Sequence, residues 1–412
     1  MSNDTQPEIR FPGFTEDWEQ RKLSELATMN ARIGWQNLRT SEFLDKGDYM
    51  LITGTDFKDG AIDYSNIHYV ERERFEQDKK IQISNGSILI TKDGTLGKVA
   101  YVEGLTMPAT LNAGVFNVRV KENLAIDSRY LFHYLKAPFL LKFADQRSTG
   151  GTIKHLNQNV LVEFPIPLPS LEEQHKVAGL LSNFDNTIAL HQRKLDLLKE
   201  TKKGFLQKMF PKNGAKVPEI RFPGFTEDWE QRKFKEFSKK TGKKNTKDLD
   251  FPAYSVSNKA GLISQTEQFD GSRLDDLEKT NYKFVEPNEF AYNPARVNVG
   301  SIAFNNLGMT VIVSSLYVVV KMSEDLDNEF ILQFIKSPTF IKEVKRNTEG
   351  SVREYLFYEN FANIKFPFTR NKEEQQKIGA FFKQLDDTIA LHQRKLDLLK
   401  ETKKGFLQKM FV

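Results

Sequence analysis

Apolar side chains recur at alternating steps of four and three residues along two long stretches of the chain. The positions are Val177, Leu181, Phe184, Ile188, His191, Leu195 and Leu198 in the first stretch, and Ile378, Phe382, Leu385, Ile389, His392, Leu396 and Leu399 in the second. This spacing places the side chains on one face of a helix and is typical of a coiled-coil seam. We therefore expect two long helices that pair as an antiparallel coiled coil. The first, over 171–210, would be about 60 Å long at 1.5 Å per residue.

Both stretches open with a helix-start pattern. Ser170 precedes Glu173 by three residues, and Asn371 stands in the same relation to Glu374. A Ser-x-x-Glu pattern predicts a capping box, in which the side chains of the two residues bind backbone N–H groups at the helix start.

Two residue types interrupt the apolar seam. His191 and His392 occupy seam positions. They are interpreted as polar residues that fix the register of the helix pair, with a pH switch or a metal pair as the alternative. Gly204 and Gly405 lie within the last turns and weaken the helix prediction there.

Outside these stretches the pattern favours β-strands. Alternating β-branched and aromatic residues predict strands at 49–52, 87–90, 99–102, 311–313 and 316–320, and shorter helices are expected at 128–143 and 328–344. Glycine and aspartate separate the strand candidates. Mixed strands and helices in each half predict two α+β globules.

Two blocks of sequence occur twice, letter for letter. Pro7–Lys22 is repeated as Pro218–Lys233, and Thr187–Phe210 as Thr388–Phe411, whereas the segments between them differ. A recent duplication without functional content would have left the middles alike as well. Identical ends with divergent middles suggest one shared partner and two different ligands.

Composition narrows the function classes. The 412 residues contain no cysteine, which excludes disulfides, thiolate metal sites and thiol nucleophiles. We expect neither a signal peptide nor a membrane span, because no stretch approaches about 18 apolar residues. With 60 Lys+Arg against 55 Asp+Glu, the net charge is only +5. A nucleic-acid function must therefore depend on where the charges lie.

Three glycine-bearing segments of the first half match three in the second half. They carry small hydroxyl or amide residues with Lys or Arg, the groups that contact base edges and phosphates. The candidates are Thr55, Lys58, Lys92, Thr95, Lys98, Thr152 and Lys154, matched by Ser257, Asn258, Lys259, Arg296, Asn298, Ser351 and Arg353. Ordinary surface turns are the alternative. A basic stretch at 232–247, with Phe234 and Phe237 interleaved, is either a phosphate-contacting patch or a solubilised loop.

Motifs for catalysis are incomplete. Residues 94–99 differ from a Walker loop in the number of residues between the glycines. Residues 292–295 differ from the Asn-Pro-Pro-aromatic motif of amino-methyltransferases, because Ala295 stands in place of the second proline. The six histidines form neither an HExxH motif nor a ligand cluster. We expect no catalytic or metal-binding residue.

Several short motifs follow one another in a fixed order along the first half, and some of them recur in the second. They are Phe-Pro-Gly-Phe with a following Trp at 11–18 and 222–229, Thr-Gly-Gly-Thr-Ile at 149–153, a proline run at 164–169, Glu-Gln at 173–174, and Asp-x-Thr-Ile at 185 and 386. Over essentially its full length the chain resembles the specificity subunit of type I restriction–modification enzymes. The second half departs at Glu349 and at 366–369, where the first glycine of the loop and the full proline run are absent.

The resemblance implies an α+β fold organised as a pseudo-twofold tandem repeat. It implies target-recognition domains at 1–170 and 215–370, and spacer helices at 171–214 and 371–412. Each domain would read one half of a split, asymmetric sequence in double-stranded DNA, and the helices would set the gap. The fixed blocks would dock two methyltransferase subunits, with candidate contacts at Phe11, Phe14, Trp18, Phe222, Phe225 and Trp229.

The resemblance also implies what this chain lacks. S-adenosylmethionine would be bound by the methyltransferase subunits and ATP/Mg by restriction–translocase subunits, with no cofactor in this chain. The complex would be cytoplasmic, bacterial and DNA-associated. Two alternatives remain: a non-catalytic bivalent scaffold for protein partners, which salt-sensitive binding to duplex DNA would distinguish, and a fused enzyme with its own methyltransferase activity.

Overall fold

The computed structural model of the protein describes residues 6–147, 156–212, 214–258, 261–268, 279–347 and 355–411. The chain forms two compact units: Met1–Leu190 with Leu396–Val412 (unit 1), and His191–Lys395 (unit 2). Each unit therefore combines one globule with a stretch of both long helices.

Unit 1 contains two four-stranded sheets. Their strand orders are β2-β11-β8-β9 and β6-β3-β10-β7, and the pairing of β3 with β10 is parallel. The strands are β2 (Ala27–Ala31), β3 (Met50–Ile52), β6 (His68–Tyr69), β7 (Gln82–Ile83), β8 (Ile88–Thr91), β9 (Val99–Tyr101), β10 (Ala109–Leu111) and β11 (Val115–Val120). A hairpin, β4 (Phe57–Lys58) with β5 (Ala61–Ile62), and a two-stranded sheet, β1 (Glu19–Lys22) with β12 (Pro165–Leu168), complete the set. The helices of this globule are α1 (Leu23–Leu26), α2 (Arg72–Glu76), α3 (Ser128–Lys136), α4 (Phe139–Gln146) and α5 (Gln158–Leu161).

Unit 2 repeats this plan. Its sheets have the orders β14-β21-β18-β19 and β16-β15-β20-β17, again with one parallel pairing, between β15 and β20. The strands are β14 (Ser238–Lys240), β15 (Ala253–Ser257), β16 (Gly261–Ser264), β17 (Lys283–Val285), β18 (Glu289–Tyr292), β19 (Ile302–Phe304), β20 (Val311–Val313) and β21 (Val318–Met322), with β13 (Glu230–Lys233) paired to β22 (Lys365–Phe368). The helices are α7 (Gln265–Gln268), α8 (Asn328–Ile335), α9 (Pro338–Asn347) and α10 (Tyr358–Asn363). The predicted α+β class is confirmed in both units.

The helical stretches expected at 128–143 and 328–344 are present, and each consists of two helices. α3 ends before Pro138, and α9 begins at Pro338. Proline lacks the N–H needed inside a helix and pushes the preceding residue toward extended backbone, and Ala137 accordingly has φ −69° and ψ 160°. The break lies at the same place in both units.

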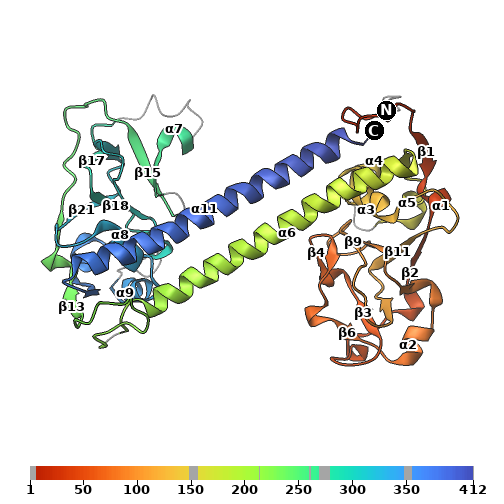
Figure 1. Ribbon diagram of the computed structural model, residues 1–412, viewed down its shortest axis with the longest axis horizontal. Coiled ribbons are helices and arrows are strands. Elements are labelled where there is room, and N and C mark those ends of the chain that lie inside the picture. Colours follow the sequence, from red (N-terminus) through yellow and green to blue (C-terminus); the bar gives the residue numbers. More distant parts are fainter. Residues whose placement is uncertain are drawn as a thin grey trace. The chain divides into compact units, whose positions relative to one another are not determined.

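The two long helices are α6 (Leu171–Lys208) and α11 (Lys372–Lys409), each of 38 residues (Figure 1). Both continue past Gly204 and Gly405. In unit 1 the ring of Phe184 on α6 lies 5.5 Å from that of Phe406 on α11. In unit 2, α6 residues 191 and 205 face α11 residues 392 and 381, so the helices run antiparallel there, as predicted.

The ends of the long helices complete the cores of the globules. Met410 and Phe411 lie in the unit 1 core beside Val177 and Leu181, and Met209 and Phe210 lie in the unit 2 core. The first seam residues of each helix thus pack against a globule as well as a helix. Each globule therefore depends on the end of a helix for part of its buried apolar surface.

Candidate nucleic-acid interface

The first two predicted loop segments of unit 1 lie together, and the third, 148–154, lies outside the described residues. A Cβ built on Gly54 would lie 2.9 Å from the Thr91 side chain, so the first segment packs directly against the second. The backbone N–H of Leu156 donates to the carbonyl of Lys92 at 3.1 Å, which joins the second segment to the chain that follows the third. Two segments far apart in sequence thus meet, and the described chain resumes beside them at Leu156.

Unit 2 brings the first two matching segments together through different atoms, and residues 348–353 of the third lie outside the described residues. The Ser301 hydroxyl donates to the carbonyl of Val256 at 3.2 Å, which joins the first two segments. The N–H of Leu356 donates to the carbonyl of Pro294 at 2.9 Å, the counterpart of the bond between Leu156 and Lys92. The same convergence in both units supports a common function for these segments.

The candidate residues of unit 1 are largely solvent-exposed. Thr55, Lys58, Thr95 and Lys98 are exposed, and Lys58 pairs with Asp63 at 3.5 Å. Lys92 is half-buried, and its ammonium lies 5.6 Å from the centre of the Phe116 ring. Thr152 and Lys154 lie outside the described residues. Exposed ammonium and hydroxyl groups on adjoining loops can donate to phosphate or base acceptors.

In unit 2, Asn258 and Arg296 are exposed and Ser257 is half-buried at the end of β15. Lys259, Ser351 and Arg353 lie outside the described residues, and for Asn298 only the backbone, in a short 3-10 turn, is described. When the two units are matched by their strand registers, Lys92 of unit 1 is equivalent to Pro294 of unit 2. This differs by one residue from the match expected from sequence, because the second loop of unit 2 is longer. Arg296 is therefore the one described cation among the unit 2 candidates.

The basic stretch at 232–247 does not present its aromatic residues to solvent. Phe234 is fully buried and Phe237 nearly so, both within the unit 2 core. Its lysines instead approach a residue that sequence alone did not single out: Lys244 forms a β-bridge with Lys283. Burial, together with Lys240 and Lys244, lowers the pKa of Lys283. No local signal marks Lys283 in the sequence, since only strand pairing brings it close to Lys240 and Lys244. A bound anion would relieve the repulsion between these three lysines.

Two buried ion pairs join the repeated N-terminal block to the long helices. The Arg10 guanidinium donates to both Glu173 oxygens at 2.8 and 2.9 Å, and Arg221 does the same to Glu374 at 2.6 and 2.9 Å. Both glutamates are almost fully buried. The predicted capping boxes are thus only half formed, because backbone N–H groups at the helix start bind Ser170 and Asn371 while the glutamates bind arginine.

The neighbouring glutamines extend this arrangement, which we call the clamp (Arg10, Glu173 and Gln174; Arg221, Glu374 and Gln375). The side-chain oxygen of Gln174 accepts from the backbone N–H of Asp127, the N-cap residue of α3, at 2.8 Å. The side-chain oxygen of Gln375 accepts in the same way from Asp327, the N-cap residue of α8, also at 2.8 Å. The Glu-Gln motif therefore fixes the start of each long helix to its own globule.

The six docking candidates divide into two groups. Trp18 and Trp229 are buried in the cores of their own units. Phe11 and Phe222 pack on those cores but are only half-buried. Phe14 and Phe225 are half-buried, and each lies under a lysine of the adjacent long helix, Lys176 at 4.7 Å and Lys377 at 5.0 Å. The tryptophans thus stabilise the fold, and the phenylalanines alone keep surface for a partner.

The long helices carry polar contacts at equivalent seam positions. In unit 1 Lys403 donates to Asp185 at 2.5 Å, and in unit 2 Lys202 donates to Asp386 at 2.6 Å. Burial lowers the pKa of both lysines. In unit 2 the Nδ1 atoms of His191 and His392 lie 3.0 Å apart. A shift of one helix along the other would leave the buried lysines without their aspartate partners, so these pairs fix the register of the helices. This favours the interpretation that the histidines also fix the register.

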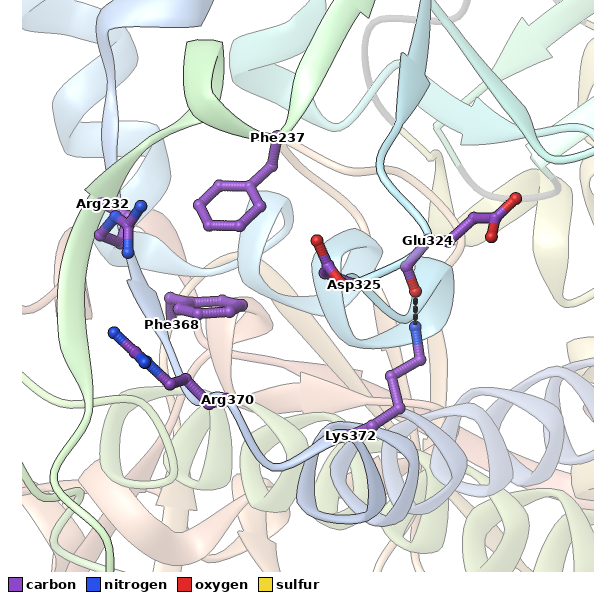
Figure 2. Close-up of a pocket in the computed structure, with 7 residues that line it drawn as sticks. All are labelled: Arg232, Phe237, Glu324, Asp325, Phe368, Arg370 and Lys372. Atoms are coloured by element: carbon purple, nitrogen blue, oxygen red, sulfur yellow. Dashed lines mark hydrogen bonds between the residues drawn. The ribbon is translucent and has the colours of Figure 1, made fainter.

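A pocket of about 500 Å³ lies in unit 2 beside β13 and β22 (Figure 2). Phe237 and Phe368 point into it. Its cations already have partners: Arg232 with Glu230 and Glu236, Arg370 with Glu230, and Lys372 with the Glu324 carbonyl. In unit 1, Leu26 and Leu168 occupy the places of the two phenylalanines. A partner that docks alike on both units does not depend on this pocket.

Across the part of the chain that the structure describes, no helix is long and apolar enough to cross a membrane. Within the same residues, no group of three or more His, Asp or Glu side chains is placed to hold a metal ion.

Comparison with known proteins now identifies the family. The profile of the type I restriction modification DNA specificity domain matches residues 15–200 and again 226–401. The chain therefore belongs to the type I restriction–modification specificity family, with two specificity domains in tandem. This agrees with the resemblance seen in the motifs.

Relatives of similar length carry the same description. The chain is 27% identical to the putative type I restriction enzyme MjaX specificity subunit of Methanocaldococcus jannaschii, over 95% of this chain and 92% of that one. It is 24% identical to the MjaVIII specificity subunit of the same organism, over 95% of each chain. The crystal structure of the type I S subunit from M. genitalium has the same fold, with a TM-score of 0.65, 15% identity and 99% coverage of both chains.

Proposed function

We propose that this chain is the DNA-reading subunit of a type I restriction–modification complex, in which each globule reads one half of a split target. The observation that carries the proposal is the contact between two loop segments in each unit, beside the point where the described chain resumes after the third, with different side chains at matched places. Lys98 in unit 1 corresponds to Ser301 in unit 2. The backbone carbonyl of Lys98 accepts from the N–H of Thr91, and the backbone carbonyl of Ser301 accepts from the N–H of Asn293. Different donors favour different bases, so the two halves of the target differ in sequence.

Arg296→Ala tests this assignment. If the exposed guanidinium contacts a guanine in bidentate fashion, its loss should cost about 1–3 kcal/mol of binding and relax specificity at one position of one half-site. The measurement is competition binding of the complex to duplexes that vary each half separately. Lys98→Ala removes an exposed cation from the second loop segment of unit 1 and should affect the other half-site. Equal weakening on all duplexes would reduce Arg296 to a phosphate contact.

The repeated helix block is proposed to dock two copies of one partner, the methyltransferase subunit. Leu190 and Leu197 on α6 are 64% and 60% exposed, and Leu391 and Leu398 on α11 are 44% and 67% exposed. Each pair is spaced by seven residues, so it occupies one helix face away from the seam. Identical, solvent-exposed leucines at identical spacing suit an identical partner on each helix.

Native mass spectrometry of the co-expressed complex tests the docking. We expect two methyltransferase subunits per chain, one after Leu197→Ser or Leu398→Ser, and none after both. Lys199→Ser, at an exposed position of the same helix, serves as the control and should leave two. A single methyltransferase subunit on the unaltered chain at saturating partner would contradict two equivalent docking faces.

The catalytic work is assigned to partners. We infer that the methyltransferase subunits bind S-adenosylmethionine and that restriction–translocase subunits bind ATP/Mg, while this chain transfers no methyl group and cuts no DNA. We infer also that the complex acts in the cytoplasm, on host and foreign DNA. Methyl transfer by the purified chain alone with labelled S-adenosylmethionine would refute this division of labour.

A further inference from the structure

The two units differ at the residue that begins the helix after the third loop segment. In unit 1 this residue is Asn157, whose side-chain oxygen accepts from the N–H of Asn159 at 2.9 Å and caps α5. In unit 2 the equivalent residue is Phe357, since Leu356 makes the backbone bond that Leu156 makes in unit 1. Phenylalanine cannot accept this bond, so α10 begins without a side-chain cap. Unit 2 thus forgoes a favourable helix start that unit 1 keeps.

Phe357 is also unfavourably exposed. Its side chain is 46% exposed, although it is a large aromatic. Its ring lies nearly parallel to that of Tyr355, with an angle of 8° between the planes and 5.7 Å between the centres. Tyr355 therefore supports the ring from one side, while nearly half of the Phe357 surface faces solvent. A residue that costs stability both as a cap and as exposed apolar surface is commonly retained for binding.

The position of this ring connects it to the proposed reading loops. The bond from Leu356 to Pro294 places Phe357 next to the segment that carries Arg296, which is exposed, and Val299, which is 55% exposed. The corresponding segment of unit 1 presents Lys92, Thr95 and Lys98 instead. The unit 2 edge thus combines one guanidinium with an exposed aromatic ring, whereas the unit 1 edge combines lysine and threonine with an aliphatic side chain, Leu141, which is 38% exposed and lies against Gly97.

Apolar contact has a specific counterpart on DNA. The 5-methyl group of thymine is the apolar feature of the major-groove edge, and phenylalanine is among the side chains that meet it. We propose that Phe357, supported by Tyr355, contacts a thymine methyl group in the half-site read by unit 2. This inference rests on the proposed DNA-reading function and adds to it the identity of one recognised base.

Replacing thymine by deoxyuridine tests the proposal, because it removes only the methyl group. The complex with methyltransferase subunits is titrated with duplexes carrying deoxyuridine at each thymine of the unit 2 half-site in turn, on either strand. One replacement should weaken binding about fourfold, as expected for one buried carbon. The same replacement should have no effect on the Phe357→Asn variant. Replacements in the unit 1 half-site should affect both proteins alike.

The variant also has a stability readout. Phe357→Asn restores the cap residue of unit 1 and removes an exposed ring, so its melting temperature should be equal to or above that of the unaltered chain while its affinity is lower. Lower stability and lower affinity together would mean that Phe357 serves the fold, which would overturn the proposal.

Other outcomes separate this inference from the function beneath it. If the unaltered complex does not prefer its target over scrambled duplex, the DNA-reading function itself fails. If it binds specifically but every deoxyuridine replacement is silent, or if the half-site contains no thymine, only the thymine contact fails. An equal deoxyuridine loss in Phe357→Asn would assign the methyl contact to another residue. Uniform weakening on all sequences would indicate that the ring inserts as a wedge.

Discussion

The two units use the same contacts where the globule meets the helix and different contacts where the loops converge. Arg10 with Glu173 in unit 1 matches Arg221 with Glu374 in unit 2, atom for atom, and Gln174 matches Gln375. At the loop edge, Asn157 is replaced by Phe357 and Lys98 by Ser301. The contrast separates residues that attach a domain to its helix from the residues that we propose read the DNA target.

Under the proposed function, the contrast gives the chain a way to vary its target. The clamp contacts lie within repeated motifs and inside the protein, so changes at the loop edge leave them intact. A loop edge can therefore change its side chains, as between Asn157 in unit 1 and Phe357 in unit 2, while the attachment of the globule to the long helix stays the same. The following predictions break one side of this comparison at a time.

The largest effect is expected at the clamp. Arg10→Ala or Arg221→Ala would leave a buried glutamate without its charged partner, at a cost of about 3 kcal/mol in the free energy of unfolding. Because the two clamps are alike, the losses should be alike, as measured by urea unfolding. Arg21→Ala, at an exposed pair with Glu25, is the control and should change little. A loss at only one clamp would show that the two units are not attached equivalently.

A smaller effect separates the units by pH. Burial lowers the pKa of His133 in unit 1 to about 3, whereas Gln333 occupies the same place in unit 2. The native state binds fewer protons than the unfolded state, so the stability from neutral His133 is present above pH 6.5 and falls as the pH drops toward 3.

Between pH 7 and pH 5 the free energy of unfolding should fall by about 2 kcal/mol because of His133, at 1.36 kcal/mol per unit of pKa. His133→Gln should abolish it, as measured by urea unfolding at the two pH values. If the variant loses as much stability in acid as the unaltered chain, His133 is not the responsible group.

The smallest effect on stability is expected when the two long helices are lengthened together. The quantity to measure is then the gap between the two half-sites. We propose that the length of the helices sets this gap. Inserting one heptad between Leu195 and Leu198, and another between Leu396 and Leu399, keeps the seam in phase and lengthens each helix by about 10 Å. At ~3.4 Å per base pair the preferred gap should grow by up to about three pairs, with both half-sites unchanged.

Sequencing of methylated sites would measure that gap. An intact, DNA-binding double-insertion variant that keeps the original gap would contradict this role of the helices and leave them as docking surfaces. A single insertion in α6 alone is the control, and should disrupt helix pairing through loss of register.

Much of this organisation was predictable from sequence. The seam spacing and the identical blocks predicted two long antiparallel helices and two α+β globules, because heptads and repeats are periodic signals that need no tertiary information. The split of α3 from α4 was also accessible, since Pro138 marks it.

The details of the site were less accessible. The clamp joins Arg10 to Glu173 across 163 positions, and Lys283 meets Lys244 only through strand pairing, so neither has a local signal. The role of Phe357 required the comparison with Asn157, which depends on knowing that Leu156 and Leu356 make equivalent bonds. Trp18 and Trp229 were noted as docking candidates because they lie in repeated motifs, yet core packing explains their repetition equally well.

One measurement tests the central claim, that two differently equipped units read two parts of one target. Genomic DNA from cells carrying this chain with its methyltransferase subunits would be sequenced for methylated adenines. We predict one asymmetric motif, made of two specified parts separated by an unspecified gap, and the part that changes in Arg296→Ala should be one of the two. A symmetric motif, an uninterrupted motif, or a change in both parts on altering Arg296 would contradict the account.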